Sequence, residues 1–133
     1  MHNILITGAA SGIGAATARL FHLRGWRVGL LDINAAALAS LAAELGDAWH
    51  CALDVSDAEA VAAALADFTG SQSSQLRLLF NCAGILRVGR FEEISLAEHA
   101  RILQVNVIGV LQITHAAFRY LKATPAAQVI NMG

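Results

Sequence analysis

Three glycines, Gly8, Gly12 and Gly14, follow a short apolar run, Ile4–Ile6, close to the beginning of the sequence. Glycines at a turn between a strand and a helix let the backbone approach a ligand closely. The helix then presents its free N–H groups and positive dipole end to that ligand. The spacing therefore predicts a strand, a tight turn and a helix that together bind the pyrophosphate of a dinucleotide, with a plain tight turn as the structural alternative.

A second apolar run, residues 27–31, ends in Asp32, about 20 residues after the glycines, where an acidic side chain can bind an adenosine ribose. A carboxylate at this place would repel a 2′-phosphate, and positions 9, 10, 33 and 34 carry no Arg or Lys to attract one. Asp32 therefore favours NAD over NADP as the cofactor. An exposed acid at a strand end and a helix-capping acid remain alternative interpretations.

Apolar runs and helical patterns alternate along the whole sequence. The runs predict five strands, at residues 3–7, 27–31, 48–53, 76–80 and 128–132, with helices between them. This alternation predicts an α/β fold: a doubly wound, Rossmann-type parallel sheet with helices on both faces and the strand order 3-2-1-4-5. The ligand crevice would lie at the carboxyl ends of the first and fourth strands. Residues 1–133 would form a single dinucleotide-binding domain.

Polar residues indicate where the helices begin. Asn34 is a candidate N-cap, and Ser56–Glu59 and Ser95–Glu98 have the pattern of capping boxes. Ser56 is expected to cap its helix in preference to Asp54. The second box opens the longest predicted helix, which is expected to continue to about residue 120.

Composition and charge exclude several classes of protein. Charged residues make up only 14% of the chain, against roughly 25% in typical soluble domains. This favours a sheet buried on both faces, or a partner that covers apolar surface. The net charge of −1 and the scattered basic residues predict no nucleic-acid partner. The most apolar long stretch, residues 102–118, is interrupted by polar side chains, so no membrane span is expected.

Cysteine and histidine usage indicates a reducing compartment and no metal site. Cys51 and Cys82 fall in strand or strand-end positions that are predicted to be buried, and they are expected to be reduced thiols rather than a disulfide. The five histidines show no metal-ligand spacing. No basic region precedes the first apolar residues, as it would in a signal peptide, so a cytoplasmic protein is expected.

Four motifs, in this order, resemble the short-chain dehydrogenase/reductase family across essentially the whole chain. They are the turn Thr7–Gly14, Leu53–Val55 after the third strand, Asn81–Gly84 after the fourth strand, and Asn106 within the long helix. The Gly-x-x-x-Gly-x-Gly spacing suits this family better than the Gly-x-Gly-x-x-Gly of other dinucleotide folds. Together the four motifs are specific, whereas any one alone would not be.

The resemblance implies a role in cofactor binding for most of these residues. Ser11 and Ile13 would contact the phosphates and the nicotinamide side, and Asp32 would bind the ribose hydroxyls. The side chain of Asp54 and the backbone of Val55 would contact the adenine. The full set of implied cofactor-binding residues is Gly8, Ser11, Gly12, Ile13, Gly14, Asp32, Ile33, Asp54, Val55, Asn81, Ala83 and Gly84.

The fourth strand and the long helix would supply the rest of the site. Asn81 would brace the sheet, and the small Ala83 and Gly84 would let the cofactor lie against the backbone, while Cys82 replaces the second Asn of the family's Asn-Asn-Ala-Gly. The resemblance makes Asn106 a member of a catalytic tetrad that holds a proton-relay water. Its structural alternative is a core amide that satisfies a helix bend, and both interpretations are compatible.

The family's remaining catalytic residues have no counterpart in this sequence. In the family a Ser would follow Gly133 directly, and a Tyr and a Lys four residues apart would stand on the next helix. Here the single tyrosine, Tyr120, is followed four residues later by Thr124, and the single lysine is Lys122. We expect the NAD(H)-binding portion of an oxidoreductase for an alcohol/carbonyl pair, shortened relative to its family and inactive alone. A non-catalytic dinucleotide-binding or interaction module is the alternative.

The long helix and the last strand are expected to leave apolar surface uncovered. Asn106 and Gly109 interrupt the middle of the helix and predict a bend there. Five apolar residues of this helix cannot all face the sheet, and the outer edge of the strand 128–132 would be unpaired. We therefore expect self-association through the helix 96–121 or through that edge. The five residues are Ile102, Val105, Ile108, Leu111 and Ile113.

Overall fold

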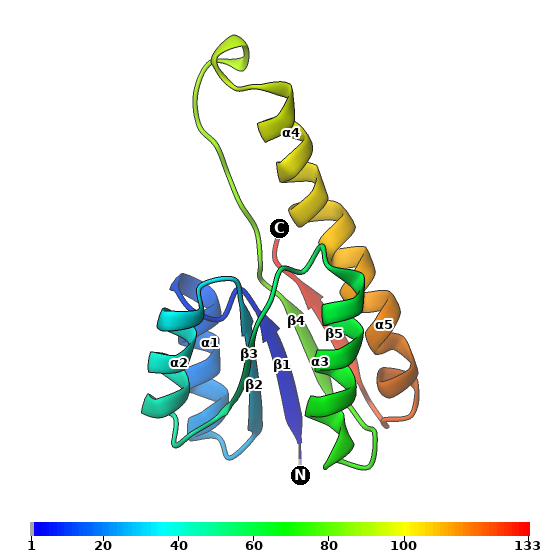
Figure 1. Ribbon diagram of the computed structural model, residues 1–133. Coiled ribbons are helices and arrows are strands. Elements are labelled where there is room, and N and C mark those ends of the chain that lie inside the picture. The colour runs from blue at the N-terminus through cyan, green and yellow to red at the C-terminus, as the bar shows by residue number, and fades with distance from the viewer. Residues whose placement is uncertain (1) are drawn as a thin grey trace.

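The computed structural model describes residues 2–133 and contains a five-stranded sheet whose paired strands are all parallel (Figure 1). The strand order is β3-β2-β1-β4-β5, which confirms the predicted order and fold class. The observed strands agree with the predicted ones to within two residues at each end. They are β1 (Asn3–Thr7), β2 (Arg27–Asp32), β3 (Trp49–Ala52), β4 (Leu78–Asn81) and β5 (Gln128–Asn131).

Helices cover both faces of the sheet. In Figure 1, α1 (Gly12–Leu23) and α2 (Ala35–Glu44) lie over one face, whereas α3 (Ala58–Gly70) and α5 (Val110–Lys122) lie over the other. Each pair of helices closes its own hydrophobic core against the sheet. The two cores fix the carboxyl ends of the strands at one edge of the sheet, where the connecting loops meet.

The central strand β1 contributes to both cores because successive side chains of a strand point to opposite faces. Ile4 and Ile6 pack with residues of α1 and α2, whereas Leu5 packs with Leu65 and Phe68 of α3. All of these side chains are fully buried. Burial on both faces explains why this run is continuously apolar. It also accounts for part of the low share of charged residues in the chain.

Two of the three predicted N-caps are confirmed, and one is wrong. The Asn34 side chain accepts a hydrogen bond from the backbone N–H of Ala37, and Ser95 and Glu98 form the predicted capping box. The helix α3 is capped by Asp57, which accepts from the N–H of Ala60 at 3.1 Å, and not by Ser56. The Ser56 hydroxyl is instead engaged by an acidic side chain, described below, so it does not face the helix.

The predicted long helix is divided into three parts. α4 (Leu96–Leu103) is followed by a π-helical segment, η2 (Gln104–Gly109), and then by α5. The interruption includes Asn106 and Gly109, the two residues at which the sequence predicted a bend. In Figure 1, α4 and the short 3₁₀ helix before it, η1 (Phe91–Glu93), extend beyond the carboxyl ends of the strands.

The apolar residues of this long element face different surroundings, as expected. Val105 and Ile113 are buried in the core, whereas Ile108 and Leu111 are 39% and 61% exposed. All four residues of β5 are exposed, and its outer side has no strand partner within residues 2–133. Apolar surface is therefore open along both the helix and the last strand.

Cys51 and Cys82 are free thiols, as expected, but they are half-buried rather than buried. Cys51 lies on the edge strand β3, and Cys82 lies in the loop after β4, so neither is covered on all sides.

Within residues 2–133, no helix combines the length and apolarity that a membrane crossing requires. The same residues contain no group of three or more side chains placed to hold a metal ion.

Candidate dinucleotide site

A cavity of about 110 Å³ opens at the carboxyl ends of the strands. The loops after four strands and one face of the long helix contribute to its wall. Most of the predicted binding residues after β1, β2, β3 and β4 therefore meet at one place, as parallel strands require. The lining residues are Gly8, Asp32, Ile33, Leu53, Asp54, Val55, Ala83, Gly84, Ile85, Arg101 and Val105.

The glycine turn is held tightly between α1 and the loop after β4. A Cβ on Gly14 would lie 2.2 Å from the carbonyl oxygen of Gly8, and a Cβ on Gly8 would lie 2.8 Å from the Cα of Ala83. Gly8 and Gly12 also have φ values of +65° and +55°, which favour glycine. Close approach therefore explains why residues 8 and 14 are glycines, and the positive φ alone explains Gly12.

The N-terminus of α1 is suited to an anion. Ser11 is its N-cap residue but makes no side-chain cap hydrogen bond, in contrast to Asn34, Asp57 and Ser95 at the beginnings of α2, α3 and α4. A Cβ on Gly12 would meet no atom within 4 Å, so the turn faces open space. The exposed N–H groups and the helix dipole therefore fit a phosphate group of a dinucleotide at this turn.

Thr7, which begins the glycine motif but was not predicted to be a site residue, joins two of the loops that line the cavity. Its hydroxyl oxygen accepts hydrogen bonds from the backbone N–H groups of Cys82 and Ala83, at 3.0 and 2.9 Å. Thr7 is buried at the end of β1, and its partners follow β4. The hydroxyl therefore holds the turn after β4 against the glycine turn.

Replacing Thr7 with valine is expected to lower the free energy of unfolding by about 2 kcal/mol, because two backbone donors lose their common acceptor. Thr7→Ser keeps the hydroxyl and should cost less than about 1 kcal/mol for the lost methyl group. Urea denaturation of both variants measures the difference. Equal losses in the two variants would contradict this role of the hydroxyl.

Asp32 lines the cavity and is already oriented by backbone donors. Its two carboxylate oxygens accept hydrogen bonds from the N–H groups of Ala10 and Asn34, at 3.0 and 2.9 Å. The first bond connects it directly to the glycine turn. Ile33, the next residue, is 69% exposed and also lines the cavity. The carboxylate is thus fixed close to the turn, with lone pairs left for further donors.

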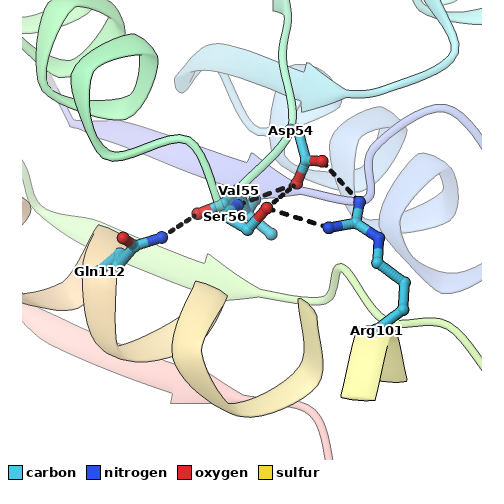
Figure 2. Close-up of polar contacts among 5 residues, drawn as sticks. All are labelled: Asp54, Val55, Ser56, Arg101 and Gln112. Carbon is cyan, nitrogen blue, oxygen red and sulfur yellow. Dashed lines mark hydrogen bonds and ion pairs between the residues drawn. The ribbon is translucent and has the colours of Figure 1, made fainter. Parts of the chain in front are cut away.

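Asp54 forms a closed network with Ser56 and Arg101 (Figure 2). Its Oδ1 accepts from the backbone N–H and the hydroxyl of Ser56, at 2.9 and 2.7 Å, and its Oδ2 accepts from Arg101 of α4 at 2.5 Å. A second arm of Arg101 donates to the Ser56 hydroxyl at 3.1 Å. Burial acts to raise the pKa of Asp54, but these hydrogen bonds and the guanidinium charge outweigh it and hold the pKa below its ordinary value.

The loop of Asp54 is held a second time at Val55. The side chain of Gln112 donates to the carbonyl oxygen of Val55 at 3.1 Å (Figure 2). A Cβ on Gly109 would lie 2.6 Å from the Val55 side chain, so only a glycine in η2 permits this approach. Residues on both sides of the π-helical segment therefore position the loop.

Asn81 braces the sheet, as expected. Its side-chain amide donates to Asn131 of β5 at 2.8 Å and to Thr114 of α5 at 3.2 Å.

The next residue, Cys82, lies against the glycine turn. Burial raises the pKa of its thiol above the ordinary value, and a hydrogen bond from the N–H of Gly14 offsets only part of this rise. A protonated thiol is a poor nucleophile, so Cys82 is suited to packing rather than to redox chemistry.

Asn106 is exposed on η2 and not buried in the core. Its amide pairs with the backbone of Ile85: Oδ1 accepts from the N–H and Nδ2 donates to the carbonyl oxygen, both at 2.8 Å. Asn106 lines a second hollow of about 390 Å³, which shares Ala83, Gly84 and Ile85 with the first cavity. The pairing anchors the chain after β4 to the long helix, at one of the residues that both hollows share.

Comparison with known proteins agrees with this geometry. The family model described as short chain dehydrogenase matches residues 2–133. The chain is 36% identical to D-threitol dehydrogenase of Mycolicibacterium smegmatis, over 96% of this chain and 50% of that protein. It is 38% identical to galactitol 2-dehydrogenase (L-tagatose-forming) of Cereibacter sphaeroides, again over 96% of this chain and 50% of that protein.

Solved structures give the same result. The chain superposes with a TM-score of 0.90 on a short-chain dehydrogenase/reductase (glucose/ribitol dehydrogenase) from Brucella melitensis. The two are 28% identical, and the match covers 98% of this chain and 55% of that one. The chain thus spans about half the length of the curated relatives it matches.

Proposed function

Because this chain belongs to the short-chain dehydrogenase family, we propose that it is the NAD(H)-binding portion of an oxidoreductase that acts on an alcohol/carbonyl pair. Residues 2–133 would act as a single dinucleotide-binding domain. The observation that carries the proposal is the uncapped N-terminus of α1, which follows the turn whose Gly8 lines the same cavity as Asp32 and Asp54. A dinucleotide needs both features: N–H donors for its phosphates and carboxylates for its ribose and adenine.

The choice of NAD over NADP rests on Asp32. Its carboxylate is fixed by the N–H groups of Ala10 and Asn34, so it cannot easily turn away from a 2′-phosphate. Calorimetric titration with NADH and NADPH tests this choice, and we expect NADH to bind more tightly. Tighter binding of NADPH would contradict the proposed use of Asp32. Binding of neither cofactor, even with the second half of a family member added, would contradict the function itself.

The proposed substrate is a secondary alcohol or polyol, by analogy with relatives whose names specify threitol and galactitol. The bound nicotinamide would supply hydride transfer, and Asn106 would hold a water for proton relay beside Ile85. The 133 residues alone should show no dehydrogenase activity. Tyr120, the single tyrosine, is buried in the core, and the single lysine, Lys122, lies at the far end of α5. Measurable turnover by the chain alone would contradict this.

We also propose that the chain self-associates through α4 and α5 or through the edge of β5. Leu103, Leu111 and Phe118 are each about 60% exposed along the long helix, and exposed apolar surface of this kind favours association. Sedimentation velocity tests the proposal, and a monodisperse monomer at all concentrations would contradict it.

Because Cys51 and Cys82 are free thiols, the cytoplasm is the proposed compartment.

A further inference from the structure

The network around Asp54 leaves a defined position free on its carboxylate. An ionised carboxylate offers about four acceptor positions, two on each oxygen. The backbone N–H and hydroxyl of Ser56 occupy both positions on Oδ1, and Arg101 occupies one on Oδ2. One acceptor position therefore remains, on the oxygen that Arg101 holds.

Arg101 controls the direction of that position. Its guanidinium donates with one arm to Asp54 and with the other to the Ser56 hydroxyl, whose own proton points to Asp54 (Figure 2). Each of the three side chains is thus fixed by the other two. Among the described residues that line the cavity, Arg101 is the only basic one. It comes from α4, outside the strand-end loops that supply most of the other lining residues.

We propose that Arg101 is a positioning residue that makes the site selective for a 6-aminopurine over a 6-oxopurine, by fixing the free acceptor of Asp54 toward the base. The inference rests on the proposed function, in which Asp54 contacts the adenine. The exocyclic amine of adenine donates a hydrogen bond to the free acceptor. The 6-oxo group of hypoxanthine presents an acceptor to an acceptor, so no hydrogen bond forms at position 6 of the base.

The loop itself does not depend on Arg101. Gln112 of α5 holds the carbonyl oxygen of Val55, and the close approach of Gly109 of η2 holds the Val55 side chain, so both contacts come from residues outside α4. Loss of the guanidinium should therefore release Oδ2 of Asp54, the oxygen with the free acceptor position, without releasing the backbone. This separates a loss of selectivity from a general loss of the site.

The test compares two probes that differ only at the base: NADH and its hypoxanthine analogue, deamino-NADH. We expect the wild-type chain to bind NADH about tenfold more tightly than deamino-NADH, because one hydrogen bond to a charged group contributes an affinity ratio of about this size. In Arg101→Met the ratio should fall to about twofold. Arg101→Lys keeps the charge but lacks the planar two-armed fork that holds Asp54 and Ser56 in a fixed geometry, and its ratio should fall to about threefold.

Arg19→Met provides the matched control, because Arg19 also forms an ion pair, with Glu44 at 2.8 Å, but outside the cavity. Its ratio should stay at the wild-type value. A ratio near tenfold in both Arg101 variants would overturn the proposal, as would equal binding of the two probes by the wild-type chain. If the wild-type chain binds neither probe, even with the second half of a family member added, the proposed function fails, and this inference fails with it.

Discussion

Replacing Gly14 with alanine is expected to weaken NADH binding at least 100-fold and to lower the free energy of unfolding by about 3 kcal/mol, the upper range for overpacking. The added Cβ would lie 2.2 Å from the carbonyl oxygen of Gly8 and 2.9 Å from its carbonyl carbon. Gly8 cannot retreat, because its own α-carbon already faces the backbone of Ala83. The turn must therefore open, which moves the N–H groups of α1 away from their ligand.

Gly46→Ala is the matched control for this change. Gly46 follows the C-cap of α2 with φ +71°, and a Cβ there would meet no atom within 4 Å. The substitution should cost about 1 kcal/mol of unfolding free energy through its positive φ and leave NADH affinity unchanged. Calorimetry with NADH and urea denaturation measure both quantities. Normal NADH affinity in Gly14→Ala would show that the turn does not contact the cofactor.

Replacing Asp32 with serine is expected to reduce the preference for NADH over NADPH from about 100-fold or more to less than tenfold. Two unit charges 4 Å apart interact by about 4 kcal/mol at an effective dielectric constant of 20, which exceeds the worth of a single hydrogen bond to the ribose. Repulsion of the 2′-phosphate by Asp32 should therefore dominate selectivity. The variant should lose some affinity for NADH and gain affinity for NADPH.

Asp57→Ser makes the same substitution at a helix N-cap that does not line the cavity. Serine is also a good N-cap, so this control should keep both stability and the NADH preference. Parallel titrations with NADH and NADPH at one ionic strength give the comparison. An unchanged preference in Asp32→Ser would assign the selectivity to other residues.

The features that could be predicted from the sequence depend on short stretches of chain. The apolar run Ile4–Ile6 and the spacing of Gly8, Gly12 and Gly14 determine a strand and a turn by local chemistry, and the alternation of such units determined the sheet order. Asn34 and the Ser95 capping box were predictable for the same reason, since each cap needs only its next three residues.

The features that could not be predicted depend on distant or competing partners. Arg101 reaches Asp54 across 47 residues, and its role follows from how α4 sits over the loop, which no local pattern specifies. The Ser56 hydroxyl could either cap α3 or bind Asp54, two residues before it. It donates to Asp54, and Asp57 caps α3 instead. Thr7 looks like any strand residue until β4 lies beside β1.

The π-helical segment Gln104–Gly109 sets the rotational phase between the two ends of the long helix. Residues in an α-helix advance by about 100° each, so one residue more or fewer in η2 would turn α4 by roughly that angle relative to α5. Arg101 would then leave Asp54 while Gln112 still faced Val55. The length of this segment is therefore as much a constraint on the site as the identity of any side chain in it.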